Sequence, residues 1–448
     1  MRIELPDKVQ KIIRMIEENG YEAYAVGGCV RDSLLGRVPS DWDVTTSASP
    51  QVVKQLFGHT VDTGIAHGTV TVLMGGEGFE VTTFRIDGEY KDARHPEQVL
   101  FTDSLREDLR RRDFTINAMA YNERAGLVDL FDGAGDLKRR VIRCVGDPGE
   151  RFSEDALRIL RAVRFAAQLD FSIDSNTAGM AEKLAPTLKK ISAERIRMEL
   201  EKLITSAHPE RLKTAWELGL TAQFLPEFDA VMEQPQNSSH HIYNVGDHTL
   251  KTLMNIPPAR HLRLTMLLHD LGKPKVVYLK EDGIYHFHGH AAASGSMAGD
   301  ILRRLKYDTQ TIRTVCRLVE VHSLYPEETP QGVRRAAHRI GPELFRDFLL
   351  VKRADTLGQS PAVHEKKLTY LDRIEKLYDE ICDRGDPLTL RELAVTGADL
   401  MTDGMKRGPA IGDVLEKLLD EVLECPEHND KEYLISLSRR IRENPVAS

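Results

Sequence analysis

Residues 26–44 read VGGCVRDSLLGRVPSDWDV, and this stretch predicts the fold of the N-terminal part of the chain. An apolar segment ends at two glycines, a short helical pattern containing Arg31 follows, and Asp41 and Asp43 stand two positions apart. Side chains at positions i and i+2 of a strand lie on one face, so we expect the two carboxylates to point the same way. Their mutual repulsion predicts a cation between them.

The glycine pair adds a phosphate-binding element to this pattern. Glycines lack a Cβ atom, so a phosphate can approach backbone N–H groups near Gly28, where a helix is expected to begin. Arg31 offers a forked donor to phosphate oxygens. Carboxylates such as Asp41 and Asp43 suit Mg²⁺, which binds through one or two of them together with substrate phosphates. The stretch therefore predicts a nucleotidyl-transfer site with Asp41 and Asp43 as its catalytic residues. Glu80 in FEVTTFR is either a third carboxylate or a solvent-facing side chain.

The composition of the 448 residues limits the class of protein. With 41% hydrophobic and 29% charged residues it is typical of soluble globular chains, and its length suits roughly three domains. No apolar run reaches the ~20 residues of a membrane helix. Five scattered cysteines without CxxC spacing favour a reducing cytosol. We therefore expect a cytoplasmic protein without a membrane partner. The net charge of −8 leaves room for basic surfaces, because basic residues cluster at 105–114, 136–143 and 158–213.

The residue pattern changes from α/β to helical along the chain. We expect a helix over 7–19, a strand in 22–28, and a β-hairpin made of GTVTVLMGG and FEVTTFR, which a glycine pair joins. From about residue 150 the pattern is nearly all helical, and Ser153 is the expected N-cap of the helix in SEDALRILRAVRFAAQL. The polar stretch 233–241 predicts a boundary loop.

Four charged residues in that helical segment recur at a spacing of three: Asp155, Arg158, Arg161 and Arg164. Residues at this spacing are neighbours on a helix face. A row of arginines favours a polyanionic partner, and ordinary ion pairs are the alternative. A carboxylate that accepts from an exocyclic amino group, beside an arginine that donates to a ring nitrogen, fits cytosine and adenine but not uracil or guanine. Asp155 and Arg158 therefore suit a template-free choice of C and A.

Six motifs within residues 1–230 carry a resemblance to a known family: VGGCVRDSLLG, SDWDVTTSA, FEVTTFR, EDLRRRDFTINAMA, RFSEDALRILRAVRFAAQLDF and SAERIRMELEKLI. Together they resemble the bacterial class II tRNA nucleotidyltransferases and poly(A) polymerases, and most closely the CCA-adding members. The resemblance implies an α/β polymerase-β-like head followed by a mostly α-helical neck, body and tail. It implies addition of CMP and AMP from CTP and ATP to the tRNA 3′ end with release of pyrophosphate. An A-adding enzyme or a poly(A) polymerase is the alternative, and no DNA partner is expected.

The same resemblance assigns residue roles. It implies Mg²⁺ at Asp41 and Asp43, and base selection by Asp155 and Arg158 with support from Glu154. The residues implied to contact or flank the nucleotide are Gly28, Arg31, Arg112, Arg161 and Arg164, with Asn117 bracing the pocket. The segment 87–101 resembles the loop that full CCA-adding members use when switching from C to A, so its length favours addition of the final A.

A third group of motifs lies in the later block, in HHIYNVGDHTL, LLHDLGKP, HFHGHAAAS, EVHSLY and VKRADTLG. Mixed imidazole and carboxylate side chains suit a divalent metal. The block resembles an HD-type phosphohydrolase domain. The resemblance implies a second divalent metal held by His248, His269, Asp270 and Asp355, with His290 and His322 completing a further position. Hydrolysis of a phosphoester on RNA or a nucleotide is the alternative function of another class, and a structural body for tRNA is the other alternative.

These patterns predict four parts. Residues 1–145 form the catalytic head, and 146–230 the helical neck for base selection and RNA binding. Residues 231–380 form the HD domain, and 381–448 a helical tail that binds the tRNA acceptor arm.

Overall fold

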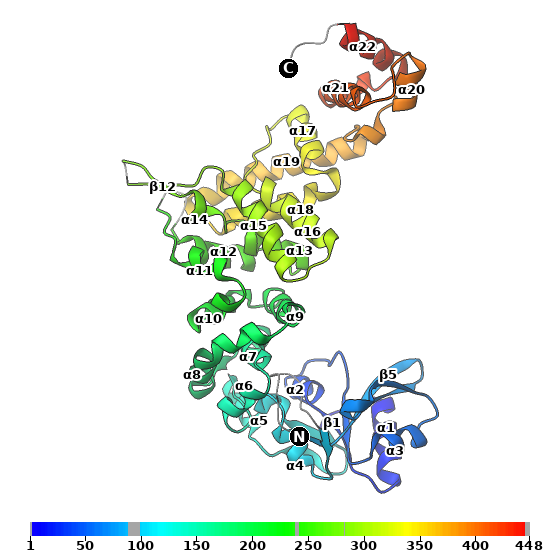
Figure 1. Ribbon diagram of the computed structural model, residues 1–448, viewed down its shortest axis with the longest axis vertical. Helices are drawn as coiled ribbons and strands as arrows, with labels where there is room; N and C mark the ends of the chain where they lie inside the picture. Colours follow the sequence, from blue (N-terminus) through cyan, green and yellow to red (C-terminus); the bar gives the residue numbers. More distant parts are fainter. Residues whose placement is uncertain (1, 88–98, 238–241, 282, 444–448) are drawn as a thin grey trace. The chain divides into compact units, whose positions relative to one another are not determined.

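The computed structural model describes residues 2–87, 99–237, 242–281 and 283–443 (Figure 1). The chain divides into two compact units, Met1–Pro226 and Glu227–Ser448. The finer division into head, neck, HD domain and tail stays a prediction. Most of the loop expected at 87–101, and the second half of the boundary loop expected at 233–241, lie outside the described residues.

A seven-stranded sheet forms the centre of the first unit, with the strand order β3-β4-β5-β2-β1-β8-β9. Its strands are β1 Ala23–Val26, β2 Val44–Thr46, β3 Thr60–Gly64, β4 Thr69–Met74, β5 Glu77–Thr83, β8 Met119–Asn122 and β9 Gly126–Asp129. β2 and β5 run parallel, and the other described pairs in this sheet are antiparallel. The β4–β5 pair confirms the predicted hairpin, and Gly75 and Gly76 supply the two positive φ angles at its turn.

Helix α1 (Asp7–Glu18) confirms the helix expected over 7–19 and buries Val9, Ile12 and Ile16. It packs on β1, and α3 (Pro50–Leu56) lies beside it (Figure 1). The remaining elements of the sheet region are α2 Gly28–Leu34, η1 Ile65–His67, β6 Arg85–Asp87, β7 Val99–Phe101, α4 Leu105–Arg110, η2 Thr115–Asn117, α5 Gly133–Arg139 and β10 Val141–Ile142. β6 and β7 pair at the two ends of the segment 88–98.

The expected N-cap at Ser153 is wrong, because the helix there starts earlier and ends sooner. Asp147 caps α6 (Pro148–Glu154) by accepting from the Glu150 N–H group, and Pro148 occupies the first turn. Asp155 is extended, with φ −144°, and α7 (Leu157–Leu169) begins after it. Asp155 therefore does not lie on the helix face that carries the arginines. The unit continues with β11 Ser172–Ile173, α8 Ser175–Leu184, α9 Ala193–Ile204 and α10 Leu212–Glu217.

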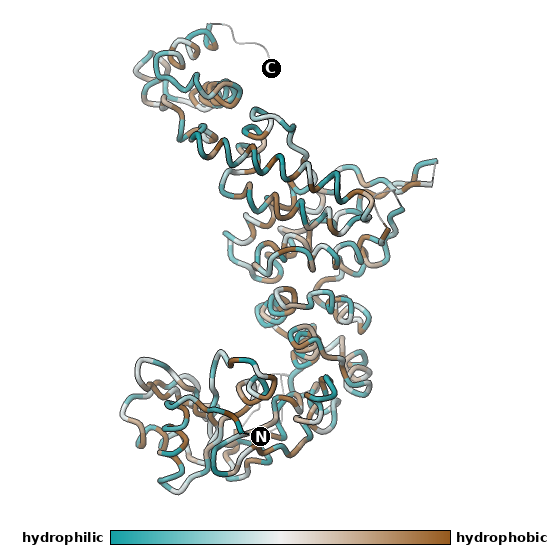
Figure 2. The backbone as a smooth tube through the Cα atoms, turned by 180° about the vertical axis from the view of Figure 1, so that it is seen from behind, coloured by the Kyte–Doolittle hydropathy of each residue, from teal (hydrophilic) through white to brown (hydrophobic). Residues whose placement is uncertain are grey.

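The second unit is mainly helical. Its longer elements are α11 Pro226–Glu233, α12 Val245–Met254, α13 Arg260–Leu268, α14 Lys273–Val276, α15 His290–Arg304, α16 Thr309–Val321, α17 Pro330–Ile340, α18 Pro342–Leu357, α19 His364–Arg384, α20 Gly397–Thr402, α21 Ala410–Glu424 and α22 Lys431–Glu443, with the short strands β12 Tyr278–Leu279 and β13 Tyr285–His286. Polar and apolar residues alternate along these helices (Figure 2), as amphipathic packing requires. None of the helices in the described part of the chain has the length and apolar character that crossing a membrane requires.

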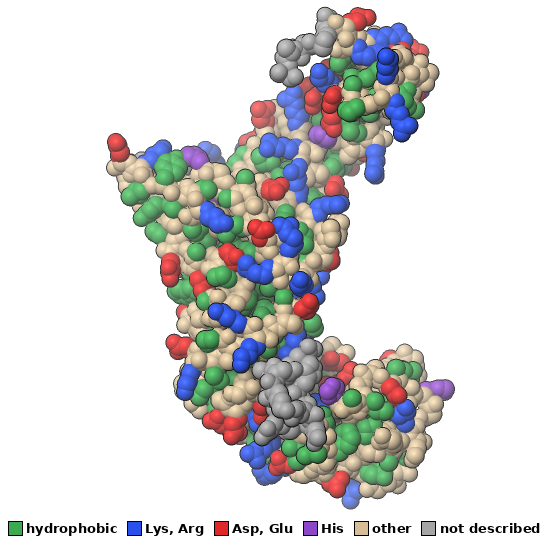
Figure 3. Space-filling view, in the orientation of Figure 1, with side chains coloured by type: hydrophobic (Ala, Val, Ile, Leu, Met, Phe, Trp, Pro, Cys, Tyr) green, Lys and Arg blue, Asp and Glu red, His purple; other side chains and the backbone are tan. Residues whose placement is uncertain are grey.

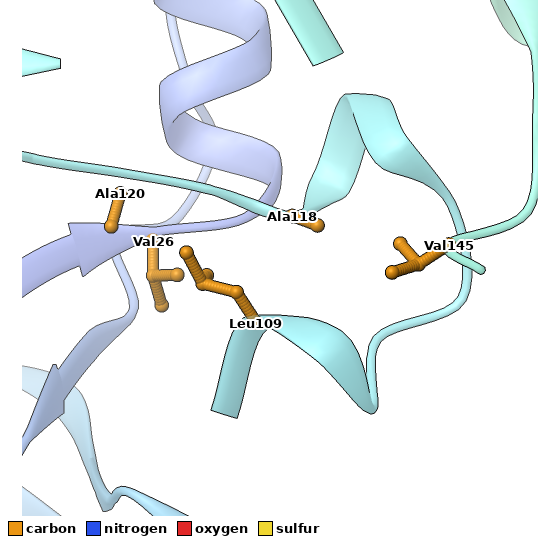
Figure 4. Close-up of a cluster of buried hydrophobic side chains, with 5 residues drawn as sticks. All are labelled: Val26, Leu109, Ala118, Ala120 and Val145. Atoms are coloured by element: carbon orange, nitrogen blue, oxygen red, sulfur yellow. The ribbon is translucent and has the colours of Figure 1, made fainter. Parts of the chain in front are cut away.

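A small apolar cluster lies beneath the loops of the first unit that carry the predicted nucleotide site. Val26, Leu109, Ala118, Ala120 and Val145 are fully buried and lie together (Figure 4). Three of them lie next to segments of the predicted nucleotide site. Val26 ends β1, Leu109 lies in α4, and Ala118 begins the turn into β8. The cluster therefore holds three separate segments of the chain in one place.

Candidate active site and candidate metal centre

The predicted metal-binding carboxylates lie just before a strand rather than within it. β2 begins at Val44, so the expectation that Asp41 and Asp43 lie on the strand is wrong. Backbone pairing nevertheless anchors this segment, because the Asp43 carbonyl accepts from the Val26 N–H group at 3.0 Å. Val44 is in register with Val81 of β5, and this brings Asp43 beside Glu80.

Asp43 carries the influence of two other carboxylates, Asp41 and Glu80. Desolvation by surrounding protein and the negative charges of Asp41 and Glu80 raise the pKa of Asp43 to about 6, against the opposing charge of Arg112. Both aspartates remain open to solvent. Clustered carboxylates in an accessible position are a suitable donor set for a hard divalent cation.

The glycine turn faces Arg112. Gly27 has φ +83°, a conformation that favours glycine, and a Cβ atom there would lie 3.1 Å from Arg112 Nη1. Sequence reasoning emphasised Gly28, which begins α2 and is not in that conformation. The Gly27 N–H group donates to the Met119 carbonyl at 3.1 Å. The turn, Arg112 and Asp43 thus border one region.

Arg31 is fixed in place by two neighbours. It donates to both carboxylate oxygens of Asp32 at 2.9 Å and to Asn117 Oδ1 at 2.7 Å. Asn117 in turn donates to Asp113 at 3.1 Å. Asn117 therefore lies beside Arg31, where a bracing residue is expected. Sequence reasoning missed Asp113, although it stands next to Arg112 in the same motif.

Each arginine of α7 has an acidic partner. Arg158 contacts Glu154 at 2.6 Å, the pairing expected for a supporting carboxylate. Arg161 donates to Asp113 at 2.8 Å, and Arg164 contacts Glu199 at 2.6 Å. The alternative of ordinary ion pairs therefore describes this row better than an unbalanced positive face.

The guanidinium of Arg164 also lies on the ring of Phe165, with 3.7 Å between its Cζ atom and the ring centroid. Burial lowers the pKa of Arg164 to about 10. Arg31 and Arg161 lie at 5.2 and 5.5 Å from the same centroid. Phe165 thus gathers three of the predicted nucleotide-contacting arginines.

Asp155 pairs with an arginine that sequence reasoning missed. Arg195 of α9 reaches both of its oxygens, at 3.2 and 2.7 Å, and the Leu157 N–H group donates to Oδ1 at 3.0 Å. The structure does not pair Asp155 with Arg158. The available sequence signal was the position of Arg195 in SAERIRMELEKLI, a motif of the same family pattern.

Basic and acidic side chains are interspersed on the face of the molecule shown in Figure 3.

The predicted HD ligands converge in the second unit. His248 Nε2 lies 3.3 Å from His269 Nε2 and 3.1 Å from Asp355 Oδ1. His269 Nε2 lies 3.2 Å from Asp270 Oδ2. Ligands bound at 2.0–2.1 Å to one metal lie about 3.0–3.4 Å apart. The donor atoms of His248, His269 and Asp270 lie close enough together to share one ion, and Asp355 contacts this group through His248.

Surrounding groups orient these ligands. Nδ1 of His248 and of His269 must donate to the carbonyls of Gly358 and Met266, at 3.0 and 2.7 Å, because a carbonyl cannot donate. Both Nε2 lone pairs are thereby directed into the cluster. Burial opposes ionisation of Asp270, but His269 and Lys273 outweigh it and hold its pKa well below the usual range. The chemistry of this donor set fits a divalent transition metal.

Fold and site together define a class of protein: a nucleotidyltransferase with a polymerase-β-like head and a helical remainder. Residues 23–143 match the family model described as "Poly A polymerase head domain". Residues 170–232 match "Probable RNA and SrmB- binding site of polymerase A", and residues 284–437 match tRNA nucleotidyltransferase domain 2.

Relatives identify the family within that class. The CCA-adding enzyme of Limosilactobacillus fermentum is 56% identical over 440 residues, which cover 97% of this chain and 98% of the relative. That of Levilactobacillus brevis is 52% identical over 448 residues, covering 97% and 99%. With the CCA-adding enzyme of Limosilactobacillus reuteri, 54% identity extends over 203 residues, 45% of this chain and half of the relative. The chain belongs to the family of CCA-adding enzymes.

Solved structures agree in fold. The CCA-adding enzyme of Bacillus stearothermophilus in complex with CTP is similar at a TM-score of 0.75 with 30% identity, covering 98% of this chain and 99% of that chain. The CCA-adding enzyme of Thermotoga maritima complexed with tRNA_CCA shares the fold at a TM-score of 0.60 with 20% identity, covering 98% and 99%. The predicted fold class and family are confirmed.

Proposed function

We propose that this chain adds CMP and AMP from CTP and ATP to the 3′ end of tRNA without a template and releases pyrophosphate. The observation that carries the proposal is the carboxylate cluster of Asp41, Asp43 and Glu80 beside the Gly27 turn and Arg112. A whole-chain relative at 56% identity with the name CCA-adding enzyme supports it, as does the similar structure in complex with CTP. The free cysteines among the described residues suit a cytoplasmic location.

Asp41 and Asp43 would hold Mg²⁺, because hard carboxylate oxygens are its preferred ligands and the negative charges of Asp41 and Glu80 act on Asp43. When bound, the ion would supply positive charge for the triphosphate and for the attacking hydroxyl. Gly28, Arg31 and Arg112 would contact the nucleotide. The residues of the chain position the phosphates and compensate their charge, so the reaction needs no protein nucleophile.

Asp155 and Arg158 would select the base through its pairing edge. An ionised carboxylate only accepts hydrogen bonds and a guanidinium only donates them, a combination that suits the amino group and ring nitrogen of cytosine and adenine. Arg161 and Arg164 would flank the nucleotide. Glu154 holds Arg158 at 2.6 Å and limits its freedom before a nucleotide binds.

The decisive experiment supplies tRNA that lacks its CCA end with labelled CTP and ATP, separately and together. A CCA-adding enzyme incorporates C from CTP alone and adds the final A once both nucleotides are present. Incorporation of A without C would instead establish an A-adding enzyme or a poly(A) polymerase.

A second function is favoured by the convergence of His248, His269, Asp270 and Asp355. We propose that these residues bind a divalent metal and that the centre hydrolyses a phosphoester. The double variant His269→Ala/Asp270→Ala tests ligation by metal analysis of the purified chain. Loss of bound metal with retained CCA addition supports the centre, and unchanged metal content contradicts it.

A further inference from the structure

Asp108 of α4 is a fully buried carboxylate that lies outside the set of residues proposed to contact the nucleotide. Its side chain is 0% exposed. The next residue, Leu109, belongs to the apolar cluster beneath the site loops, together with Val26 and Ala120 (Figure 4). This packing fixes α4 in place. Because acidic side chains are rarely buried unless they are paired, the partners of Asp108 indicate what it does.

The two oxygens of Asp108 connect three segments of the first unit. Oδ1 accepts from Arg111 Nε at 3.1 Å and from Arg111 Nη2 at 2.8 Å. Oδ2 accepts from the Thr45 hydroxyl at 3.1 Å and from Arg112 Nη2 at 3.4 Å. Thr45 lies on β2, two positions after Asp43. Asp108 therefore links Arg112 to the strand that follows the proposed metal-binding carboxylates.

Asp108 carries a negative charge in this position. Removal from water raises the pKa of a carboxyl group, but the charges of Arg112 and Arg111 outweigh this effect and lower the pKa of Asp108 below its usual value. The contact with Arg112 is therefore a hydrogen bond between two charged groups, which is stronger than one between neutral groups.

Arg112 has donors left for an anion. Within the described part of the chain its guanidinium hydrogen-bonds only to Asp108, and its Nε atom is buried without a partner. Nη1 lies on the other side, 3.1 Å from the place that a Cβ atom on Gly27 would occupy. The side chain is 20% exposed. A guanidinium that is held through one nitrogen and borders the glycine turn is suited to bind phosphate oxygens through its other donors.

A second acidic group attracts the same guanidinium. The positive charge of Arg112 acts on Asp43, which is proposed to hold the metal. An Arg112 side chain that moved onto Asp43 would cover a metal-binding oxygen and leave the phosphates. The contact with Asp108 opposes this movement, because Thr45 and Arg111 hold the Asp108 carboxylate in place.

We propose that Asp108 is a positioning residue for nucleotide transfer, which holds the Arg112 guanidinium beside the Gly27 turn so that Arg112 can bind the triphosphate. This role rests on the proposed contact between Arg112 and the nucleotide. Asp108 itself does not touch the substrate, since it is fully buried. It therefore acts on the affinity for the phosphates and leaves the affinity for the nucleoside unchanged.

Asp108→Asn keeps the shape of the side chain and removes its charge. We expect the dissociation constant for CTP with Mg²⁺ to rise at least about tenfold, the loss of one hydrogen bond between charged groups. The dissociation constant for cytidine, which has no phosphate, should not change. Calorimetry measures CTP, and competition against CTP measures cytidine. An unchanged affinity for CTP, or an equal loss for both compounds, overturns the positioning role.

Asp136→Asn is the matched control. Asp136 of α5 is also 0% exposed and accepts from the Thr115 hydroxyl at 2.7 Å. It pairs with Arg139 at 2.8 Å and with Arg143 at 3.3 Å, and neither arginine is proposed to contact the nucleotide. We expect a loss of stability in chemical denaturation comparable to that of Asp108→Asn, with unchanged affinity for CTP. An equal loss of CTP affinity in the control overturns the positioning role.

Arg112→Gln separates the failure of this role from the failure of the Arg112 assignment. If Arg112→Gln leaves the affinity for CTP unchanged, both are overturned. If it weakens CTP binding and Asp108→Asn does not, only the positioning role is overturned. The double variant should bind CTP no more weakly than Arg112→Gln alone, because Asp108 acts through Arg112, and additive losses overturn the role.

Thr45→Val provides a test that keeps the buried charge, in case Asp108→Asn does not fold. Valine has nearly the shape of threonine but lacks the hydroxyl that donates to Asp108. We expect the dissociation constant for CTP to rise about threefold, in line with one hydrogen bond to the carboxylate, and that for cytidine to stay the same. No change for CTP, or an equal change for both compounds, overturns the positioning role.

Discussion

Arg195 holds Asp155 through both carboxylate oxygens, at 3.2 and 2.7 Å, and so links α9 to the residue proposed to select the base. Asp155 lies in the extended segment between α6 and α7, where the backbone conformation by itself does not fix the orientation of its side chain. The bidentate contact specifies that orientation. We therefore propose that Arg195 positions Asp155 for base selection.

Arg195→Lys should weaken discrimination between CTP and UTP about tenfold, because the lysine ammonium group lacks the planar pair of donors with which arginine contacts both carboxylate oxygens. The measurement is kcat/KM for both nucleotides with tRNA that lacks CCA. Glu194→Gln, an exposed change on the same turn, is the control. A uniform loss for both nucleotides would show a purely structural role.

Asp155→Ala should relax base choice more than it weakens triphosphate binding, because the lost carboxylate is the proposed acceptor for the amino group of the base. We expect the CTP preference over UTP to fall by at least about tenfold, in line with about 1.5–3 kcal/mol for a hydrogen bond to a charged group. Nucleotide competition assays give the binding affinity separately. Unchanged discrimination would contradict the pairing mechanism.

Asp41→Asn and Asp43→Asn should each reduce nucleotide transfer about 10³-fold, since the loss of metal charge at the reacting phosphate is worth several kcal/mol. The measurement is single-turnover incorporation of C. Glu77→Gln on β5, whose carboxylate pairs with Lys8 at 2.8 Å, is a control outside the cluster. Glu80→Gln tests the third carboxylate. A loss of transfer as large as that of the aspartate variants would identify Glu80 as a metal ligand.

Gly27→Ala should destabilise the first unit by about 1–3 kcal/mol, because alanine is strained at φ +83° and its Cβ atom would press on Arg112. Gly28→Ala is the matched control, since the nearest atom to its Cβ lies 3.7 Å away and it occupies a helical position. Chemical denaturation measures both. Equal destabilisation would show that the Gly27 conformation is not the cause.

Lys352 should make stability depend on pH. It is 2% exposed, with Nζ 3.6 Å from the Tyr325 ring centroid, and burial lowers its pKa to about 8 from 10.5. Between these two pKa values the unfolded chain binds more protons at Lys352 than the folded chain does. The contribution of Lys352 to the free energy of unfolding therefore increases as pH rises. Relative to Lys352→Met, the native chain should gain roughly 3 kcal/mol between pH 7.5 and 10.5. The exposed Lys366→Met should show no such difference, and a flat Lys352 comparison would contradict the buried charge.

Local patterns predicted the fold class and several of its elements. The amphipathic spacing of α1 and the paired glycines of the β4–β5 hairpin depend on neighbouring residues, and both are confirmed. The helix start expected at Ser153 was wrong, because Asp147 and Pro148 begin α6 earlier in the chain and α7 begins only at Leu157. The strand expected at Asp41 and Asp43 was wrong because strand pairing there begins at Val44.

The sequence by itself determined the family, the carboxylate pair and the histidine-aspartate motifs, because each of these is a short run of residue types with its own chemistry. Only the tertiary structure decided which charges meet. Arg195 lies 40 positions from Asp155 in the sequence, and His290 and His322 come from the ends of two different helices. Such pairings depend on helix packing, which brings together residues that no spacing along the chain relates.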